Sequence, residues 1–422
     1  MVYRSLFRNF NFLKLWGAQV ASQIAANLLN FALIIRVYEL AQGTRYANIA
    51  VSLLIISFGI PSIFFAVFAG AYIDHLDRKK VLVVSNILRA ILVLLFLIGP
   101  LEHYLLAVYI LIFIISTITQ FFIPAEGAAL PNVVKKSDLV PANSLFIFTI
   151  YASFLLGYSL AGPVVALLGA NAAYYITSGA FVFAAGLSAL LPSLRATDKK
   201  HEALLVLAHK VAKNLKASLQ KIFRSPKLLF PITQLTIAQA MTNVVIVLAP
   251  ALSVLLLHKS LSQSAYILVV PAGIGMVGGA VLIGQLFRDS NKARLITIGL
   301  FSASIGLVLF GLLDKIVPDQ LLVPIVAAVA LGLGFVNALV SVSAQTILQL
   351  NSTDETRGQI FGALNMMINI AATLPVLLAG ITADLVSPTT VLIAAGILIF
   401  AYAIFQQNYF KKYHLKTVDI AR

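Results

Sequence analysis

The sequence predicts an all-α polytopic membrane protein with twelve transmembrane helices in two six-helix bundles. Hydrophobic residues make up 60% of the 422 residues and charged residues only 11%, whereas soluble domains are about 45–50% apolar. Runs of about 20 apolar residues, the length that crosses a hydrocarbon core of about 30 Å, recur along the chain. One long basic connection, residues 192–228, divides these runs into six and six.

The first apolar run follows the bases Arg4, Arg8 and Lys14 and continues to Ile35. It is too long for the apolar region of a signal peptide, so we expect an uncleaved first span. The expected spans are 12–36, 46–73, 81–99, 104–127, 143–168, 171–191, 229–257, 264–287, 294–313, 320–350, 358–385 and 389–408. The expected domains are an N-terminal bundle (1–191), a cytosolic linker (192–228), a C-terminal bundle (229–408) and a cytosolic tail (409–422).

The basic residues that give the chain its net charge of +15 are distributed as the predicted topology requires. If the N-terminus is cytosolic, most of the 30 Lys and Arg residues fall on the cytosolic face, and Arg89 lies inside the third span. The opposite face holds only Arg36, Arg45, Lys259 and Lys315. The positive-inside rule therefore predicts cytosolic termini in a plasma (bacterial inner) membrane. We expect the bases to contact anionic lipid headgroups and not nucleic acid.

The linker contains apolar residues at helical spacing with lysines between them. This pattern predicts a basic amphipathic helix in the inner membrane interface; the alternative is a solvated charged linker. The apolar positions are Leu207, Val211, Leu215, Leu219, Ile222 and Phe223.

Two spans carry polar stripes that repeat at a nearly constant offset. In the first span the stripe is Gln19, Ser22, Gln23, Asn27 and Asn30; in the seventh it is Gln234, Thr236, Gln239, Thr242 and Asn243. The repetition favours a duplicated six-helix unit, as in secondary transporters. Amides are costly in lipid, so each stripe is expected to line a substrate pathway or to join helices by hydrogen bonds.

The stretch "GAYIDHLDRKK", residues 70–80, ends the second span. Gly70, Asp74, Arg78 and Lys79 match a motif of the major facilitator superfamily, which the chain resembles. "FRNFNFLKLWGAQVASQ", "PAEGAALPNVVKKSDLVPANSL" and "DETRGQIFGALN" extend the resemblance to its drug and siderophore (enterobactin-exporter-like) efflux branch. The resemblance implies the fold of that superfamily and transport by alternating access.

The same motif suggests a cytosolic gate. Asp74 lies at the edge of hydrocarbon and needs a partner, and the resemblance implies that it meets the eleventh span. In "NSTDETRG", Ser352 and Glu355 fit a capping box, which predicts a helix start whose partial positive charge is reinforced by Arg357. We therefore expect Asp74 to pair with this helix start and Arg357. Glu126 is the expected partner of Arg78.

The fifth span contains "GYSLAGPVV", with Gly157, Gly162 and Pro163. It resembles the glycine-proline signature of antiporters in the superfamily. A packing surface of small residues with a proline kink explains the same residues equally well.

The expected coupling site is incomplete. Many relatives carry an aspartate four residues after a serine in the first span, but here Ser22 is followed at that spacing by Ala26. Glu126 and Asp74 are the deepest remaining carboxylates. The coupling ion is therefore a proton at Glu126, another ion, or none, with the substrate gradient alone driving transport.

The predicted function is export of small amphipathic molecules by a monomeric secondary transporter. The chain has no cysteine and no acid-rich metal cluster or nucleotide loop, so we expect no metal and no cofactor. Its neutral amides favour neutral or amphipathic substrates over small dications. The alternatives are a lysophospholipid or nutrient transporter of the same fold and, more remotely, a channel, a scramblase or a membrane enzyme.

Overall fold

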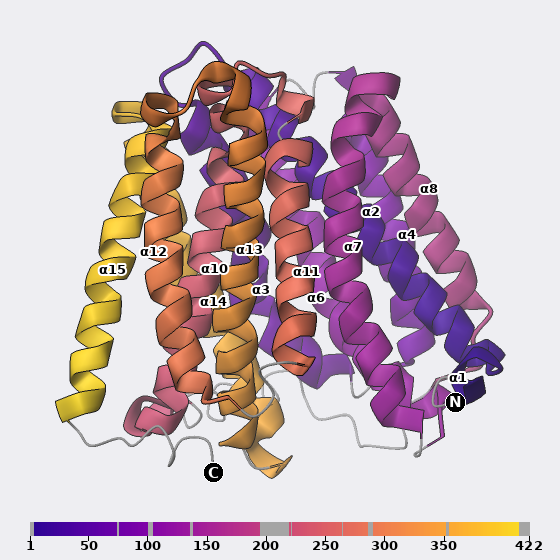
Figure 1. Ribbon diagram of the computed structural model, residues 1–422. Coiled ribbons are helices and arrows are strands. Elements are labelled where there is room, and N and C mark those ends of the chain that lie inside the picture. The colour runs from indigo at the N-terminus through magenta and orange to yellow at the C-terminus, as the bar shows by residue number, and fades with distance from the viewer. Residues whose placement is uncertain are drawn as a thin grey trace. The chain divides into compact units, whose positions relative to one another are not determined.

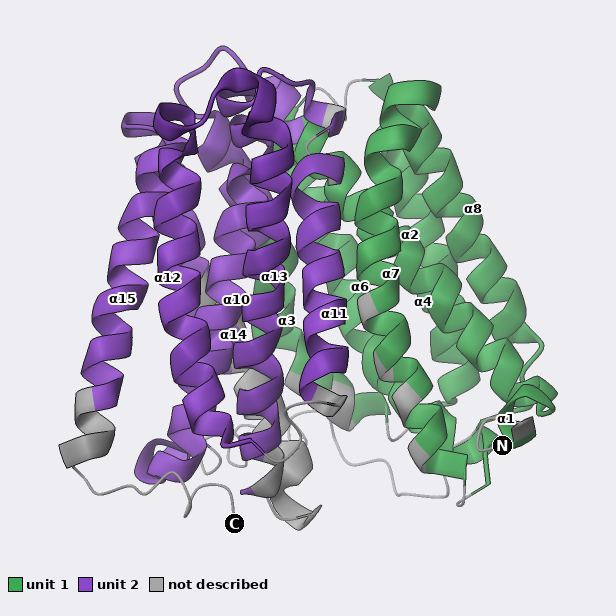
Figure 2. Ribbon diagram, viewed as in Figure 1, with its two compact units in different colours: residues 1–36, 57–213 green, residues 37–56, 214–422 purple. Residues whose placement is uncertain are grey.

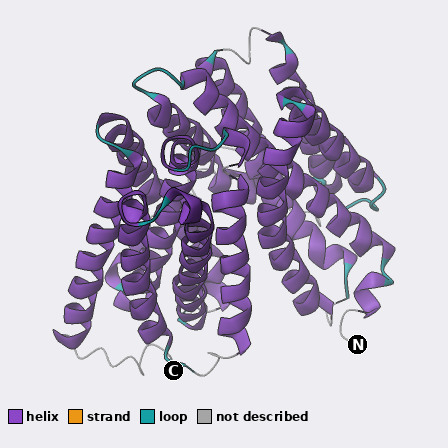
Figure 3. Ribbon diagram, turned by 45° about the horizontal axis from the view of Figure 1, so that its top comes forward, coloured by secondary structure: helices purple, strands orange, loops and turns teal. Residues whose placement is uncertain are grey.

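The computed structural model describes residues 4–73, 76–99, 104–135, 138–194, 219–220, 222–263, 265–285, 290–351 and 354–412. The regular structure of these residues is entirely helical (Figure 3). The long helices are α2 (Phe10–Ala41), α3 (Ala47–Ile73), α4 (Arg78–Leu94), α6 (Leu105–Val133), α7 (Leu139–Leu168), α8 (Ala170–Ala189), α10 (Pro226–Ala251), α11 (Val270–Gln285), α12 (Lys292–Ile316), α13 (Asp319–Leu350), α14 (Asp354–Leu385) and α15 (Pro388–Lys412) (Figure 1). The short helices are α1 (Arg4–Phe7), η1 (Leu95–Leu97), η3 (Leu252–Leu256), η4 (Leu261–Gln263) and η5 (Ala265–Val269).

Eleven helices within the described residues are long and apolar enough to cross a membrane. The eleventh predicted span, 358–385, corresponds to α14, of which only Thr373–Leu385 was found as a shorter apolar helix, and the twelfth, 389–408, corresponds to α15. Large apolar side chains on these helices face outward, as a lipid environment requires: Phe64 is 61% exposed and Leu167 is 81% exposed. The predicted all-α polytopic membrane fold is therefore confirmed.

The chain forms two compact units (Figure 2). Unit 1 comprises residues 1–36 and 57–213, and unit 2 comprises residues 37–56 and 214–422. The segment 37–56, which ends α2 and begins α3, thus groups with the C-terminal part of the chain. In unit 1, α4 packs against α6 and α8; in unit 2, α13 packs against α10, α11 and α12. The predicted bundle boundaries stay a prediction.

Several helix ends follow from local sequence. Gly169 has φ +83°, a conformation that favours glycine, and it separates α7 from α8. Its N–H donates to the backbone oxygen of Val165 at 3.1 Å. At the start of α10, Pro226 occupies the first helical position, where the missing N–H costs nothing.

The predicted amphipathic helix of the linker lies mostly outside the described residues. Of its apolar positions, Ile222 is fully buried in a cluster with Leu228, Ile232 and Leu348. Phe223, by contrast, is 61% exposed. The linker helix itself, with Leu207, Val211 and Leu215 outside the described residues, stays a prediction.

Candidate functional site

The polar stripe of α2 begins with a buried glutamine. Gln19 is 1% exposed, and its Nε2 atom donates to the backbone oxygen of Phe146 on α7 at 3.3 Å. One turn earlier, Trp16 Nε1 donates to Thr149 Oγ1 at 2.8 Å. The Oε1 atom of Gln19 is buried and has no hydrogen-bond partner among the described residues. Gln19 therefore joins α2 to α7 and leaves one buried acceptor unsatisfied.

The rest of this stripe is less enclosed. Ser22 is buried, whereas Gln23, Asn27 and Asn30 are half-buried. Asn27 packs against Gly157 of α7, where an added methyl group would lie 2.5 Å from Asn27 Cβ and 3.0 Å from a backbone oxygen of α2. Only glycine permits this approach, so part of the stripe serves helix packing.

The other small residues of the fifth-span motif also lie in α7. Gly162 is buried and Pro163 is half-buried inside the helix. The contact at Gly157 favours the packing interpretation of this motif. Its antiporter interpretation stays a prediction.

The stripe of α10 begins in the same way. Gln234 is fully buried, and its Nε2 atom donates to the hydroxyl of Tyr402 on α15 at 2.8 Å and to Thr233 Oγ1 at 3.2 Å. Its Oε1 atom, like that of Gln19, is buried without a hydrogen-bond partner in the described part of the chain. Further along α10, Gln239 is exposed and donates from Nε2 to Asn243 Oδ1 at 3.0 Å. The inner amide is thus structural and the outer pair is accessible.

A further amide, Asn337 of α13, was not singled out from the sequence. It is 4% exposed, and its Nδ2 atom donates to the backbone oxygen of Ala238 at 3.0 Å and to Thr242 Oγ1 at 2.9 Å. Ser341 Oγ donates to its Oδ1 atom at 3.3 Å. The sequence signal that could have identified Asn337 is its position as a single amide within the apolar run "LGLGFVNALV".

The described part of unit 1 contains a buried arginine. Arg89 of α4 is 1% exposed, and its guanidinium carbon lies 4.3 Å from the ring centroid of Phe122 and 4.6 Å from that of Phe181. Its Nη2 atom donates to Asn86 Oδ1 at 2.7 Å, and its Nε atom donates to the backbone oxygen of Ser85 at 3.3 Å. Two aromatic faces and two oxygens therefore stabilise the cation away from water.

Glu126 of α6 is the neighbouring acid. It is 5% exposed, and its Oε1 atom has no hydrogen-bond partner among the described residues. Arg78, the partner expected from the sequence, has a buried Nε atom that likewise lacks a hydrogen-bond partner there. The pairing of Glu126 with Arg78 stays a prediction.

The motif at 70–80 forms a capped helix start. Asp77 precedes α4, and its Oδ1 atom accepts from the backbone N–H of Lys79 at 3.1 Å. The same carboxylate accepts from the N–H of Leu194 and the hydroxyl of Ser193, both at 3.3 Å. The N–H of Arg78 donates to the backbone oxygen of Leu194 at 3.3 Å. Asp77 thus joins the start of α4 to the residues after α8.

The remaining gate residues cannot be compared with the prediction. Asp74 lies outside the described residues, as does Ser352. Gly70 lies in α3 and Arg357 in α14, where the structure describes the helices but not these positions' surroundings. The expected helix start is found, since α14 begins at Asp354. The Asp74–Arg357 pair stays a prediction.

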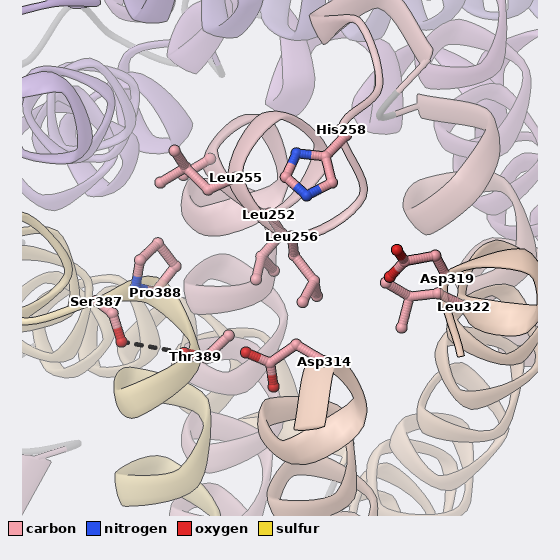
Figure 4. Close-up of a pocket in the computed structure, with 11 residues that line it drawn as sticks. Leu252, Leu255, Leu256, His258, Asp314, Asp319, Leu322, Ser387, Pro388 and Thr389 are labelled. Atoms are coloured by element: carbon pink, nitrogen blue, oxygen red, sulfur yellow. Dashed lines mark hydrogen bonds between the residues drawn. The ribbon is translucent and has the colours of Figure 1, made fainter. Parts of the chain in front are cut away.

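Unit 2 contains a pocket of about 350 Å³ where loops join its helices (Figure 4). Its floor is apolar, with Leu252 and Leu256. Its polar groups include the exposed side chains of His258, Asp314 and Asp319, together with Ser387 and Thr389. None of the polar-stripe residues lines it. Among the residues that the structure describes, no three His, Asp or Glu side chains gather as metal ligands.

Comparison with known proteins identifies relatives along the whole chain. The sequence pattern of the Major Facilitator Superfamily matches residues 15–375. The uncharacterized MFS-type transporter YfiS of Bacillus subtilis is 25% identical over 410 residues, covering 94% of this chain and 92% of the relative. The enterobactin exporter EntS of Citrobacter koseri is 24% identical, covering 82% of this chain and 78% of the relative.

Solved structures show the same fold. The nucleoside transporter NupG has a TM-score of 0.70 at 13% identity, covering 94% of this chain and 99% of NupG. The peptide transporter PepTSo of the POT family has a TM-score of 0.72 at 13% identity, covering 97% of this chain and 99% of PepTSo. At these identities the likeness concerns the fold alone.

Proposed function

The chain belongs to the major facilitator superfamily, a family of secondary transporters and not of enzymes, and we propose that it exports small amphipathic molecules by rocker-switch alternating access. The observation that carries the proposal is the neutrality of the accessible polar stripes. Gln23 and Asn30 on α2 and Gln239 and Asn243 on α10 are amides, with no carboxylate among them. Amides bind hydrogen-bonding groups without demanding a charged substrate.

One further observation supports export: EntS, a relative along most of the chain, is named as an exporter. The distribution of basic residues supports cytosolic termini in a plasma membrane. A lysophospholipid or nutrient transporter of the same fold is the alternative proposal.

Counterflow in proteoliposomes tests the proposal. Vesicles preloaded with one compound should take up its labelled form, because a carrier exchanges substrate across a gate that is never fully open. We expect exchange of neutral and singly charged amphipathic compounds but not of small dications. Exchange of lysophospholipid alone would favour the alternative, and flux without counterflow would indicate a channel or scramblase and overturn the proposal.

The polar stripes can be tested with a matched control. Gln239→Leu should weaken the apparent affinity for an exchanged compound, because it removes an accessible amide from α10. Asn132→Leu is the control, since Asn132 is an exposed amide of α6 outside both stripes. Equal affinity in both variants would exclude the α10 stripe from the substrate pathway.

We further propose that Glu126 carries the coupling proton. It is a buried carboxylate within a span, and intramembrane acids commonly serve proton relays. Glu126→Gln should abolish accumulation driven by a pH gradient while preserving counterflow, and Asp319→Asn, at an exposed acid, should preserve both. If Glu126→Gln retains pH-driven accumulation, the coupling site lies elsewhere.

A further inference from the structure

The residue before α3 is not one of the usual N-cap types. The helix begins at Ala47, and the residue before it is Tyr46, whose ring cannot accept hydrogen bonds from the first turn as Ser, Asp or Asn would. The N–H groups of the first turn have no partner within the helix. They therefore need an acceptor from elsewhere in the chain.

Asp384, in the last turn of α14, supplies that acceptor. Its Oδ1 atom accepts from the backbone N–H of Asn48 at 3.0 Å and from Asn48 Nδ2 at 2.8 Å. Its Oδ2 atom accepts from the backbone N–H of Ile49 at 2.9 Å. The carboxylate thus meets two helix-terminal N–H groups and the partial positive charge of the helix end. It acts as an N-cap contributed by a residue 336 positions away.

Two earlier turns of α14 continue the contact. Ser52 Oγ donates to the backbone oxygen of Val376 at 3.0 Å. At Gly380, an added methyl group would overlap Ser52 Oγ and lie 2.8 Å from the backbone oxygen of Asn48. The two helices therefore touch along three turns of α14, and Asp384 closes the end of this contact.

Asp384 is poorly placed for its own helix. A carboxylate in the last turn lies near the partial negative charge of the helix C-terminus. Its favourable electrostatic environment comes from α3. When α3 and α14 separate, water must replace the protein partners of both Asp384 and the α3 N-terminus. The contact can therefore be broken and remade with a modest change in free energy, as a switch requires.

We propose that Asp384 is a latch that holds the non-cytosolic ends of α3 and α14 together and releases once in each transport cycle. The inference rests on alternating access in the proposed function. By sequence, α3 belongs to the first six predicted spans and α14 to the last six, and alternating access parts these two sets. The latch lies at the end of these spans opposite to the predicted Asp74–Arg357 gate.

Spin-label distances test the latch without any substrate. The chain has no cysteine, so labels can be attached at Tyr46→Cys and Val386→Cys, whose native side chains are 64% and 66% exposed. The double-cysteine protein should show mainly a short distance. Asp384→Ala should lower the ratio of short to long distances about fivefold, the usual effect of losing an N-cap. Asp384→Asn, which keeps one acceptor oxygen but removes the charge, should lower it less.

The matched control is Asp314→Asn, which neutralises an exposed acid of unit 2 outside this contact. It should leave the distances unchanged. Distances in Asp384→Asn and Asp384→Ala that equal those of the control would overturn the latch.

A second experiment traps the contact with Asp384 in place. A short bifunctional thiol reagent joining Tyr46→Cys to Val386→Cys should stop counterflow, and either single-cysteine variant should remain active after the same treatment. Full exchange by the cross-linked protein would show that the contact need not open. Counterflow absent from every variant, including the unmodified chain, would count against the proposed function, while the distance measurement would still decide on the latch.

Discussion

The same helix pair is built twice in this chain with different interiors. From Arg78 to Lys292, and equally from Leu105 to Asp319, the offset is 214 residues, so α12 and α13 repeat α4 and α6. At the same offset, Arg89 corresponds to Ala303 and Glu126 to Val340, both almost fully buried. Unit 1 thus holds a buried base and a buried acid where unit 2 holds hydrocarbon.

This difference shows that the helix pair can fold without buried charged residues. Unit 2 shows that the helix pair packs without charge, and buried ion pairs are often no more stabilising than apolar residues of similar volume. Among the described residues, Arg89 and Glu126 are the fully buried charged side chains, and both lie in unit 1. Stability alone therefore does not account for them.

The largest expected effect comes from removing the buried cation. Arg89→Met should lower the free energy of unfolding by about 3–5 kcal/mol, because it removes the cation from the faces of Phe122 and Phe181 and leaves the buried oxygen of Asn86 without its donor. The double variant Arg89→Met/Glu126→Val, which makes unit 1 resemble unit 2, should recover much of this loss. Thermal unfolding of the purified proteins in detergent measures both changes.

Transport supplies the second readout for the double variant. We expect it to fold but to lose accumulation driven by a pH gradient. A double variant as unstable as the sum of its single variants would mean that the two charges do not interact. The difference between the two units would then not be explained by an electrostatic interaction between Arg89 and Glu126.

The next effect concerns how closely the helices approach. At Gly334 of α13 an added methyl group would overlap the backbone oxygen of Ala272 and lie 2.9 Å from its Cα atom. Gly334→Ala should therefore destabilise the protein by about 1–3 kcal/mol through overpacking. The corresponding residue of unit 1 is Gln120, half-buried on α6, where Gln120→Ala should cost less than about 1 kcal/mol. Equal melting temperatures would show that α11 can move to accommodate the methyl group.

Composition and spacing predicted most of the fold, because a membrane span is a long, local pattern. The helix starts near Arg78 and Asp354 and the separate stripes of α2 and α10 were all readable from the sequence. Side-chain partners were harder to predict. Gln19 and Gln234 resembled pathway residues, but each donates to a neighbouring helix, which no pattern within one helix can reveal.

Arg89 and Asp384 show the same limit. From the sequence, Arg89 was a base within a span. In the structure, its buried cation is stabilised by the rings of Phe122 and Phe181, which come from two other helices. Asp384 looked like an acid at a helix end, and its partners lie 336 residues away. Contacts between residues so far apart in the sequence depend on how the helices pack. The pattern of residues within any one helix does not predict that packing.

A smaller effect is expected from the neutral interior of unit 2. Asn337→Leu removes the hydrogen bonds to Ala238 and Thr242 and should cost about 1 kcal/mol, since hydrogen bonds between membrane helices are individually modest. Ser341→Ala, which removes only the 3.3 Å bond to Asn337, should cost less. Neither variant should alter pH-driven accumulation, in contrast to those at Glu126. A loss of coupling in Asn337→Leu would show that the neutral interior also takes part in transport.

The smallest effect concerns the two caps that begin the repeated helices. Asp77 caps α4, and Asn291, at the same offset, caps α12 by accepting from the N–H of Arg294 at 3.1 Å. Each change to alanine should cost about 1 kcal/mol. Asp77→Ala should cost more than Asn291→Ala because Asp77 also accepts from Leu194. Asp77→Asn should be nearly neutral if the cap requires an acceptor and not a charge, and thermal unfolding compares the three variants. A loss in Asp77→Asn as large as in Asp77→Ala would show that the charge at this turn matters in itself. It would extend the contrast between the two units to the starts of α4 and α12.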